Sequence, residues 1–168
     1  MVRLTLLAAL AACAALPAFA QVKIGLMVSA TGPTSAIGIP QKNTGDLLPR
    51  RIGATTIEYV QLDDGGDTTR AVQNVKRLVQ QDNVDALIGP STTPNALAIL
   101  DVIAEAGVPV MATVGTSAVV EPLDAKKRWV FKTTQNDDLI AAALIRHMQK
   151  TGVKSVGFVG FNDPYGEN

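Results

Sequence analysis

From residue 21 onward, apolar and polar residues follow two alternating patterns. Short apolar runs rich in β-branched residues predict strands at 22–28, 55–62, 86–88, 108–111, 129–133 and 156–159. Between them, apolar residues recur at helical spacing, most clearly at 71–79, and predict further helices at 95–106 and 137–151. Strands that alternate with helices in this way predict an α/β fold with a parallel sheet.

Capping residues support the ends of these helices. Asp67, Thr68 and Thr69 are N-cap candidates for the helix that contains 71–79, and Gly107 and Gly152 can end the two later helices. A further short helix is expected between Pro40 and Pro49, where the prolines leave it little room.

The first twenty residues have the pattern of a secretory signal peptide. Arg3 is followed by an apolar run from Leu4 to Leu16, and Ala18-Phe19-Ala20 is a small-residue cleavage site. The segment around Cys13 also matches a lipidation site, but the residues after Cys13 stay apolar. We therefore favour cleavage after Ala20 over a lipoprotein anchored at Cys13, and expect a periplasmic protein.

Composition describes a globular chain without polyelectrolyte character. Hydrophobic residues make up 47% of the 168 residues, charged residues 18%, and Lys+Arg equal Asp+Glu at 15 each. A nucleic-acid-binding face would need clustered Lys and Arg, so no nucleic acid partner is expected.

The residue pattern does not predict catalytic chemistry. His147, the single histidine, falls in an amphipathic helix, where an exposed surface position is expected, and the sequence has no metal-binding spacing of His and Cys. Asp63 and Asp64 could bind a cation or act as a base, but Asp-Asp-Gly-Gly favours turn formation and capping. We expect no enzyme, no metal and no cofactor.

The segment from Asp85 to Ala96 carries a binding signature. An apolar run ends at Gly89-Pro90, three hydroxyl residues follow, and Pro94 opens a helix. Free N–H groups and the positive end of a helix dipole suit an anion, and export makes a carboxylate on a small solute the expected one. Two more hydroxyl-rich loops, 29–35 and 115–117, follow predicted strands, so all three should share the sheet edge where ligands gather.

An ordered set of motifs resembles the leucine/isoleucine/valine-type periplasmic binding proteins, the solute receptors of ABC importers. The set consists of Thr31-Gly32-Pro33 after the first strand, Asp63-Asp64 with Asp67, Ile88-Gly89-Pro90 with Thr92-Thr93, Gly107-Val108-Pro109-Val110, and Asp163-Pro164-Tyr165-Gly166. The resemblance implies two doubly wound, Rossmann-like α/β lobes that close around the solute. It divides this chain into a signal peptide (1–20), an N-terminal lobe (21–130) and the beginning of a second lobe (131–168). Family members are about twice as long, which implies a piece of a longer receptor.

The resemblance also implies a set of ligand-binding residues. Thr93, with Gly115 and Thr116 from the following loop, is implied to hold the ligand carboxylate, and Thr92 is their neighbour. Ile37 stands where a large side chain often covers the ligand, although it is not aromatic, and Tyr165 is implied to line the cleft from the second lobe. The implied partners are an amino acid or similar carboxylated solute and an ABC permease of the inner membrane.

Two other functions stay open at this point. The ligand-sensing ectodomain of a receptor uses the same fold, and a transmembrane segment further along the protein would favour it. A periplasmic enzyme on a flavodoxin-like sheet would need nucleophile or metal residues, which this stretch does not contain.

Overall fold

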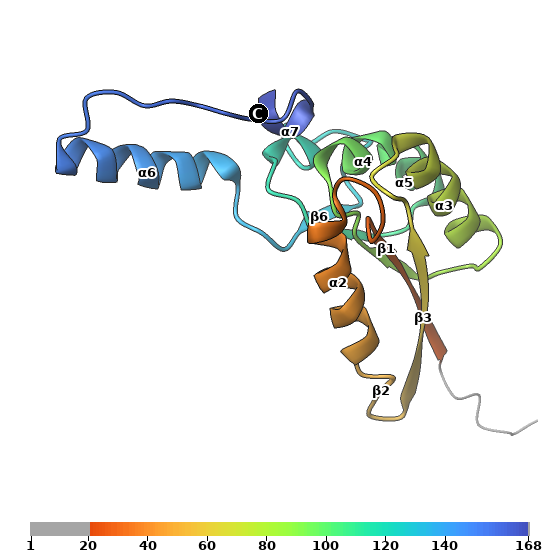
Figure 1. The fold of residues 1–168 in the computed structure, drawn as a ribbon. Coiled ribbons are helices and arrows are strands. Elements are labelled where there is room, and N and C mark those ends of the chain that lie inside the picture. The colour runs from red at the N-terminus through yellow and green to blue at the C-terminus, as the bar shows by residue number, and fades with distance from the viewer. Residues whose placement is uncertain (1–20, 168) are drawn as a thin grey trace, which may run out of the picture.

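A six-stranded sheet forms the centre of the computed structural model, which describes residues 21–167. Its strands lie in the order β2-β3-β1-β4-β5-β6 (Figure 1), with bounds β1 Gln21–Val28, β2 Arg51–Ile52, β3 Thr55–Asp63, β4 Ala86–Ile88, β5 Val110–Ala112 and β6 Val130–Lys132. All neighbours are parallel except β2, which pairs antiparallel with β3 in a short edge hairpin. The predicted α/β fold with a mainly parallel sheet is confirmed. The signal-peptide prediction and Cys13 lie outside the described residues.

Helices cover both faces of this sheet. Their bounds are α2 Ser35–Leu47, α3 Thr68–Gln80, α4 Thr93–Ala98, α5 Leu100–Ala106, the 3₁₀ turn η1 Ser117–Val119, α6 Asp137–Thr151 and α7 Pro164–Glu167. Successive residues of β1 point to opposite faces: Gly25 meets Leu78 of α3, whereas Leu26 meets Gly45 of α2. The sheet is therefore doubly wound, as predicted.

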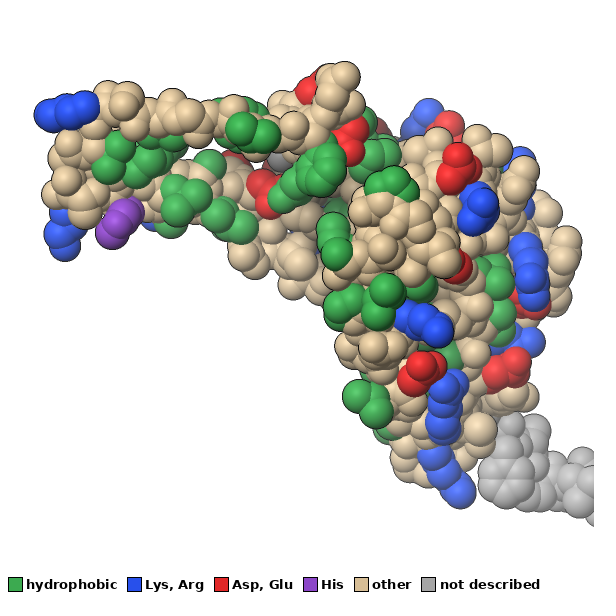
Figure 2. All heavy atoms as spheres, in the orientation of Figure 1, with side chains coloured by type: hydrophobic (Ala, Val, Ile, Leu, Met, Phe, Trp, Pro, Cys, Tyr) green, Lys and Arg blue, Asp and Glu red, His purple; other side chains and the backbone are tan. Residues whose placement is uncertain are grey.

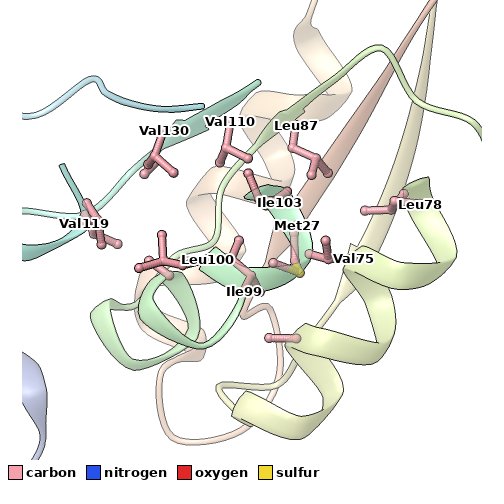
Figure 3. Packing of buried hydrophobic residues seen from close by; sticks show 14 of the residues in the cluster. Met27, Val75, Leu78, Leu87, Ile99, Leu100, Ile103, Val110, Val119 and Val130 are labelled. Carbon is pink, nitrogen blue, oxygen red and sulfur yellow. The ribbon is translucent and has the colours of Figure 1, made fainter. Parts of the chain in front are cut away.

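The core lies between the sheet and the layer of α3, α4 and α5 (Figure 3). Met27, Leu78, Ile103 and Val110 are buried there, with Leu78 at 0% exposure. The predicted N-cap of α3 is confirmed, since an Asp67 side-chain oxygen accepts a hydrogen bond from the Arg70 N–H. The apolar periodicity at 71–79 therefore gives the face that packs against the sheet.

Two helix predictions were wrong in their bounds. Helix α2 begins at Ser35, before Pro40, and includes that proline. A proline within a helix removes one hydrogen bond but does not forbid the helix; contact of Gly38 with the backbone of Ser29 and of Gly45 with Leu26 holds α2 on the sheet. The predicted helix 95–106 begins at Thr93 and is divided at Ile99, whose side chain is buried in the core.

The predicted strand at 156–159 is also wrong. These residues form no strand, and Val159 is 98% exposed. A strand needs a neighbour for its N–H and C=O groups, and within residues 21–167 none lies beside this segment. Helix α6, whose predicted bounds are confirmed, and the segment that returns from it extend away from the sheet (Figure 1) and carry exposed apolar side chains (Figure 2).

No helix among residues 21–167 combines the length and the apolar character required to cross a membrane.

Candidate ligand-binding site

A cavity of about 220 Å³ opens where the loops at the carboxyl edge of the sheet meet α2, α4 and α7. It is lined by Thr34, Ile37, Ser91, Thr92, Thr93, Pro94, Thr113, Val114, Gly115, Phe161, Asp163 and Tyr165. Ligand pockets commonly enclose about 300–1,000 Å³, so this cavity is smaller than a typical ligand pocket.

Five of the six predicted ligand residues lie on this cavity: Ile37, Thr92, Thr93, Gly115 and Tyr165. They come from four places in the chain, and the order of the strands brings together the segments that hold Ile37, Thr92 and Thr93, and Gly115. Thr116 is not among the lining residues. Its side chain is fully buried, and its hydroxyl accepts a hydrogen bond of 3.2 Å from the Ala118 N–H at the start of η1.

Gly89 makes the turn into α4 possible. Its φ of +109° is rarely adopted by residues with a side chain, and a Cβ atom there would overlap the Met27 carbonyl of β1. The chain can therefore leave β4 directly beside β1, which places Ser91 on the β1–α2 loop. The Ser91 hydroxyl accepts a hydrogen bond of 3.0 Å from the Ser29 N–H and donates one to Gln41 Oε1.

Unsatisfied polar atoms surround the start of α4. Thr93 is 3% exposed, and its hydroxyl has no hydrogen-bond partner within residues 21–167. The Thr92 hydroxyl and both polar atoms of the Asn95 amide also have no hydrogen-bond partner within these residues. A buried polar group left without a partner costs about 1–3 kcal/mol, and a ligand that supplies the partner recovers this energy.

Asp63 and Asp64 hold the loop between β1 and α2 on the end of β3. Asp63 Oδ1 accepts from the N–H groups of Ala30 (2.8 Å) and Gly65 (2.9 Å), and Asp63 Oδ2 accepts from the Thr31 hydroxyl (2.6 Å). The buried Asp64 accepts from the Ser29 hydroxyl at 2.6 Å. The predicted turn role of this pair is confirmed, and it positions the loop that leads to Thr34 and Ile37.

These hydrogen bonds change the titration of Asp63. Burial acts to raise the pKa of its carboxyl, but the hydrogen bonds from Thr31, Gly65 and Ala30 outweigh it, so the pKa lies below its ordinary value. A lowered folded-state pKa contributes stability that is present above the unfolded-state pKa and is lost as pH falls through the folded-state pKa.

We therefore expect the free energy of unfolding to fall as the pH drops below about 5, and Asp63→Asn to make this decline shallower. Denaturant titrations of the purified chain between about pH 2 and pH 7 measure both slopes. Asp46→Asn removes the same charge from the exposed surface of α2 and serves as the control. Equal pH profiles for the two variants would contradict this role of Asp63.

The wall opposite α4 comes from residues 161–165. The ring centroids of Phe161 and Tyr165 lie 6.4 Å apart. Asp163 Oδ1 accepts hydrogen bonds from the Tyr165 and Gly166 N–H groups. Both rings also border a larger hollow of about 760 Å³ that continues toward α6. The cavity is therefore open on this side.

Sequence reasoning did not single out all the lining residues. Thr34 and Ser91 belong to the hydroxyl-rich loops, and Asp163 belongs to the Asp-Pro-Tyr-Gly motif, so a signal existed for these three. Thr113 and Phe161 carried none, because only the tertiary contacts bring them to the cavity.

Within residues 21–167, no group of three or more His, Cys, Asp or Glu side chains converges as a metal site would require. His147 is exposed on α6, as predicted. The lining offers hydroxyl, aromatic and aliphatic side chains with one carboxylate, a set that suits recognition of a small polar molecule with an apolar part.

Comparisons with known proteins identify relatives over almost the whole described chain. The profile of a family described as periplasmic binding protein matches residues 21–168. The Leu/Ile/Val-binding protein BraC3 of Rhizobium johnstonii is 31% identical in an alignment of 160 positions that covers 89% of this chain and 42% of that protein.

Solved structures have the same fold. An extracellular ligand-binding receptor from Rhodopseudomonas palustris HaA2 is 44% identical with a TM-score of 0.84, over 88% of this chain and 41% of that one. A solute-binding protein of an ABC transporter from R. palustris BisB5, in complex with 3,4-dihydroxybenzoic acid, is 23% identical with a TM-score of 0.80, over 88% and 41% of the two chains. The chain thus spans about two fifths of the length of the relatives it matches.

Proposed function

Because this chain belongs to the periplasmic binding protein family, we propose that it carries one ligand-binding wall of an extracytoplasmic solute receptor that serves an ABC importer. The solute is an amino acid of the branched-chain type or a similar small carboxylated molecule. The chain binds this solute and catalyses no reaction. The observation that carries the proposal is the buried, unpartnered Thr93 hydroxyl in the wall of the cavity.

A carboxylate on the solute can accept hydrogen bonds from the unpartnered hydroxyls of the cavity wall. The hydroxyls of Thr92 and Thr93 have no partner among residues 21–167 and can donate to an anionic oxygen. Hydrogen bonds to a charged acceptor are roughly twice as strong as neutral ones.

The rest of the lining suits an apolar side chain on the solute. Ile37, Pro94 and Val114 border the cavity beside the hydroxyls, and Phe161 and Tyr165 face it from the other side. The relative BraC3 is named for binding leucine, isoleucine and valine. Its likeness to this chain supports the amino acid as the first solute to test.

Closure of two lobes supplies the mechanism. Residues 21–130 form the first lobe in this proposal, and residues 131–168 begin the second, to which Tyr165 belongs. A ligand that contacts both lobes favours the closed state, because only that state lets it make all its contacts. The closed state is then the one that the permease recognises. In this proposal the protein is exported, and cleavage after Ala20 removes residues 1–20.

The experiment tests whether binding depends on the carboxylate, by comparing each acid with the same molecule without its carboxylate. We expect L-leucine to raise the melting temperature of the full gene product that contains this chain, and isoamylamine, which is leucine without its carboxylate, to leave it unchanged. A ligand at 100 times its Kd adds about 2.7 kcal/mol to the free energy of unfolding. 3,4-Dihydroxybenzoic acid and catechol form the corresponding aromatic pair.

Binding of either acid without its decarboxylated partner supports the proposal and assigns the solute to the aliphatic or the aromatic class. Equal shifts for both members of a pair would contradict the carboxylate site. If neither acid shifts the melting temperature, both solutes named here are rejected.

A further inference from the structure

Lys132, the last residue of β6, contacts the turn that forms one side of the cavity. Its ammonium donates hydrogen bonds to the carbonyls of Gly115 (2.5 Å) and Thr116 (2.8 Å) and to the side-chain oxygen of Asn136 (2.7 Å). An ammonium has three N–H donors, so all three are used. Two of the acceptors are consecutive carbonyls beside the cavity, and the third stands at the start of α6.

Asn136 takes part in this arrangement instead of capping its own helix. It is the N-cap residue of α6, yet its side chain makes no capping hydrogen bond to that helix. Asparagine is among the residues that usually cap a helix in this position. Its oxygen instead accepts from Lys132, which ties the beginning of α6 to the turn at Gly115.

Neighbouring hydrogen bonds join the same two segments. The Asp137 N–H donates to the Gly115 carbonyl at 3.2 Å, and the Thr134 hydroxyl donates to the Val114 carbonyl at 2.5 Å. A Cβ atom on Gly115 would overlap the Asp137 carboxylate, so these two residues lie in close contact. The turn and the segment 132–137 therefore lie in direct contact.

Partial burial of the Lys132 ammonium costs free energy, because the charged group loses contact with water. Burial lowers its pKa, while the negative charges of Asp137, Glu121 and Asp138 act in the opposite direction. A group placed at such a cost needs acceptors that compensate for lost water, and the three oxygens provide them. This arrangement constrains the direction of the two peptide groups that it holds.

We infer that Lys132 is a positioning residue for the proposed solute site. By holding the carbonyls of Gly115 and Thr116, it fixes the position of the turn whose residue Gly115 lines the cavity. The inference rests on the proposed function.

The test compares two lysines with the same chemistry in different places. Lys127 also donates to two carbonyls, those of Glu121 (2.9 Å) and Pro122 (3.3 Å), and neither residue lines the cavity. Calorimetry on the full gene product measures the affinity for L-leucine, or for 3,4-dihydroxybenzoic acid if the thermal shifts favour it. Hydrogen exchange of the peptide that covers 113–118 measures the order of the turn without ligand.

We expect Lys132→Met to lower the affinity at least about tenfold, which is about 1.4 kcal/mol, and to speed exchange at 113–118. Lys132→Arg should recover part of the lost affinity, because the guanidinium can donate to the same carbonyls. Lys127→Met should leave both readouts unchanged, even if it lowers the melting temperature as much as Lys132→Met does.

The outcomes separate the inference from the proposed function. An unaltered protein that binds neither acid rejects the proposed solutes. A protein that binds, and whose affinity Lys132→Met leaves within about threefold, rejects the inference alone. If Lys132→Met does not fold, Asn136→Ala decides, since it removes one of the three acceptors and no helix cap: unchanged affinity and exchange then reject the inference.

Discussion

Replacing Thr93 by valine is expected to weaken solute binding by more than tenfold. The change removes the hydroxyl but keeps a branched side chain of similar size in a position that is only 3% exposed. The Thr93 hydroxyl has no other partner within residues 21–167, so its donor is free for the solute carboxylate. A hydrogen bond to a charged group contributes about 1.5–3 kcal/mol, or about 10- to 150-fold in affinity.

Calorimetry with the acid that binds in the thermal-shift experiment measures this loss on the full gene product. Thr68→Val is the matched control, because Thr68 is the first residue of α3 as Thr93 is of α4, but it is exposed and is not among the residues that line the cavity. An affinity that Thr93→Val leaves unchanged would remove Thr93 from the proposed site. Equal losses in both variants would point to a general effect on the fold.

Leu78→Ala is expected to cause the largest loss of stability, about 2–5 kcal/mol in the free energy of unfolding. Leu78 is 0% exposed and packs from α3 against Gly25 of β1 and the neighbouring core. Truncation to alanine removes apolar contacts and leaves a cavity that the surrounding side chains fill only in part. Denaturant unfolding of the purified chain, followed by circular dichroism, measures the difference.

Leu47→Ala provides the comparison for this prediction. Leu47 ends α2, a helix of the same 13-residue length as α3, but its side chain is 85% exposed. We expect a change within about 0.5 kcal/mol. Similar losses for the two variants would show that Leu78 is not part of the core that the structure describes.

Local patterns predicted the elements whose ends carry their own signals. Helix α6 runs from Asp137 to Thr151 as expected, because a glycine with φ of +74° ends it at residue 152. Helix α3 is capped by Asp67 in the same way. The α2 prediction was wrong in its bounds because the contacts of Gly38 and Gly45 with distant segments lengthened a helix that Pro40 and Pro49 were expected to limit. The strand at 156–159 was predicted from its β-branched residues, but the described chain offers it no neighbour.

In the candidate site, too, local patterns predicted some features and only contacts between distant segments decided the others. The hydroxyl-rich loops and the motif around Tyr165 were predicted as ligand-binding segments, and five of the six named residues line one cavity. The burial of Thr116 and the hydrogen bonds of Lys132 had no signal in the sequence. Both depend on which side chains meet after the loops pack, and spacing along the chain does not encode that.

The sequence by itself determined the class of fold, the position of most strands and helices, and the family resemblance that the comparisons confirm. These follow from local periodicity, glycines and caps, which act over a few residues. Only the tertiary structure decided that Ile37, Thr93, Gly115 and Tyr165 share a cavity, and that Lys132 holds one of its walls. The physical reason is that parallel strands joined by helices bring loops far apart in the chain to one edge of the sheet, where packing then determines which atoms face the cavity.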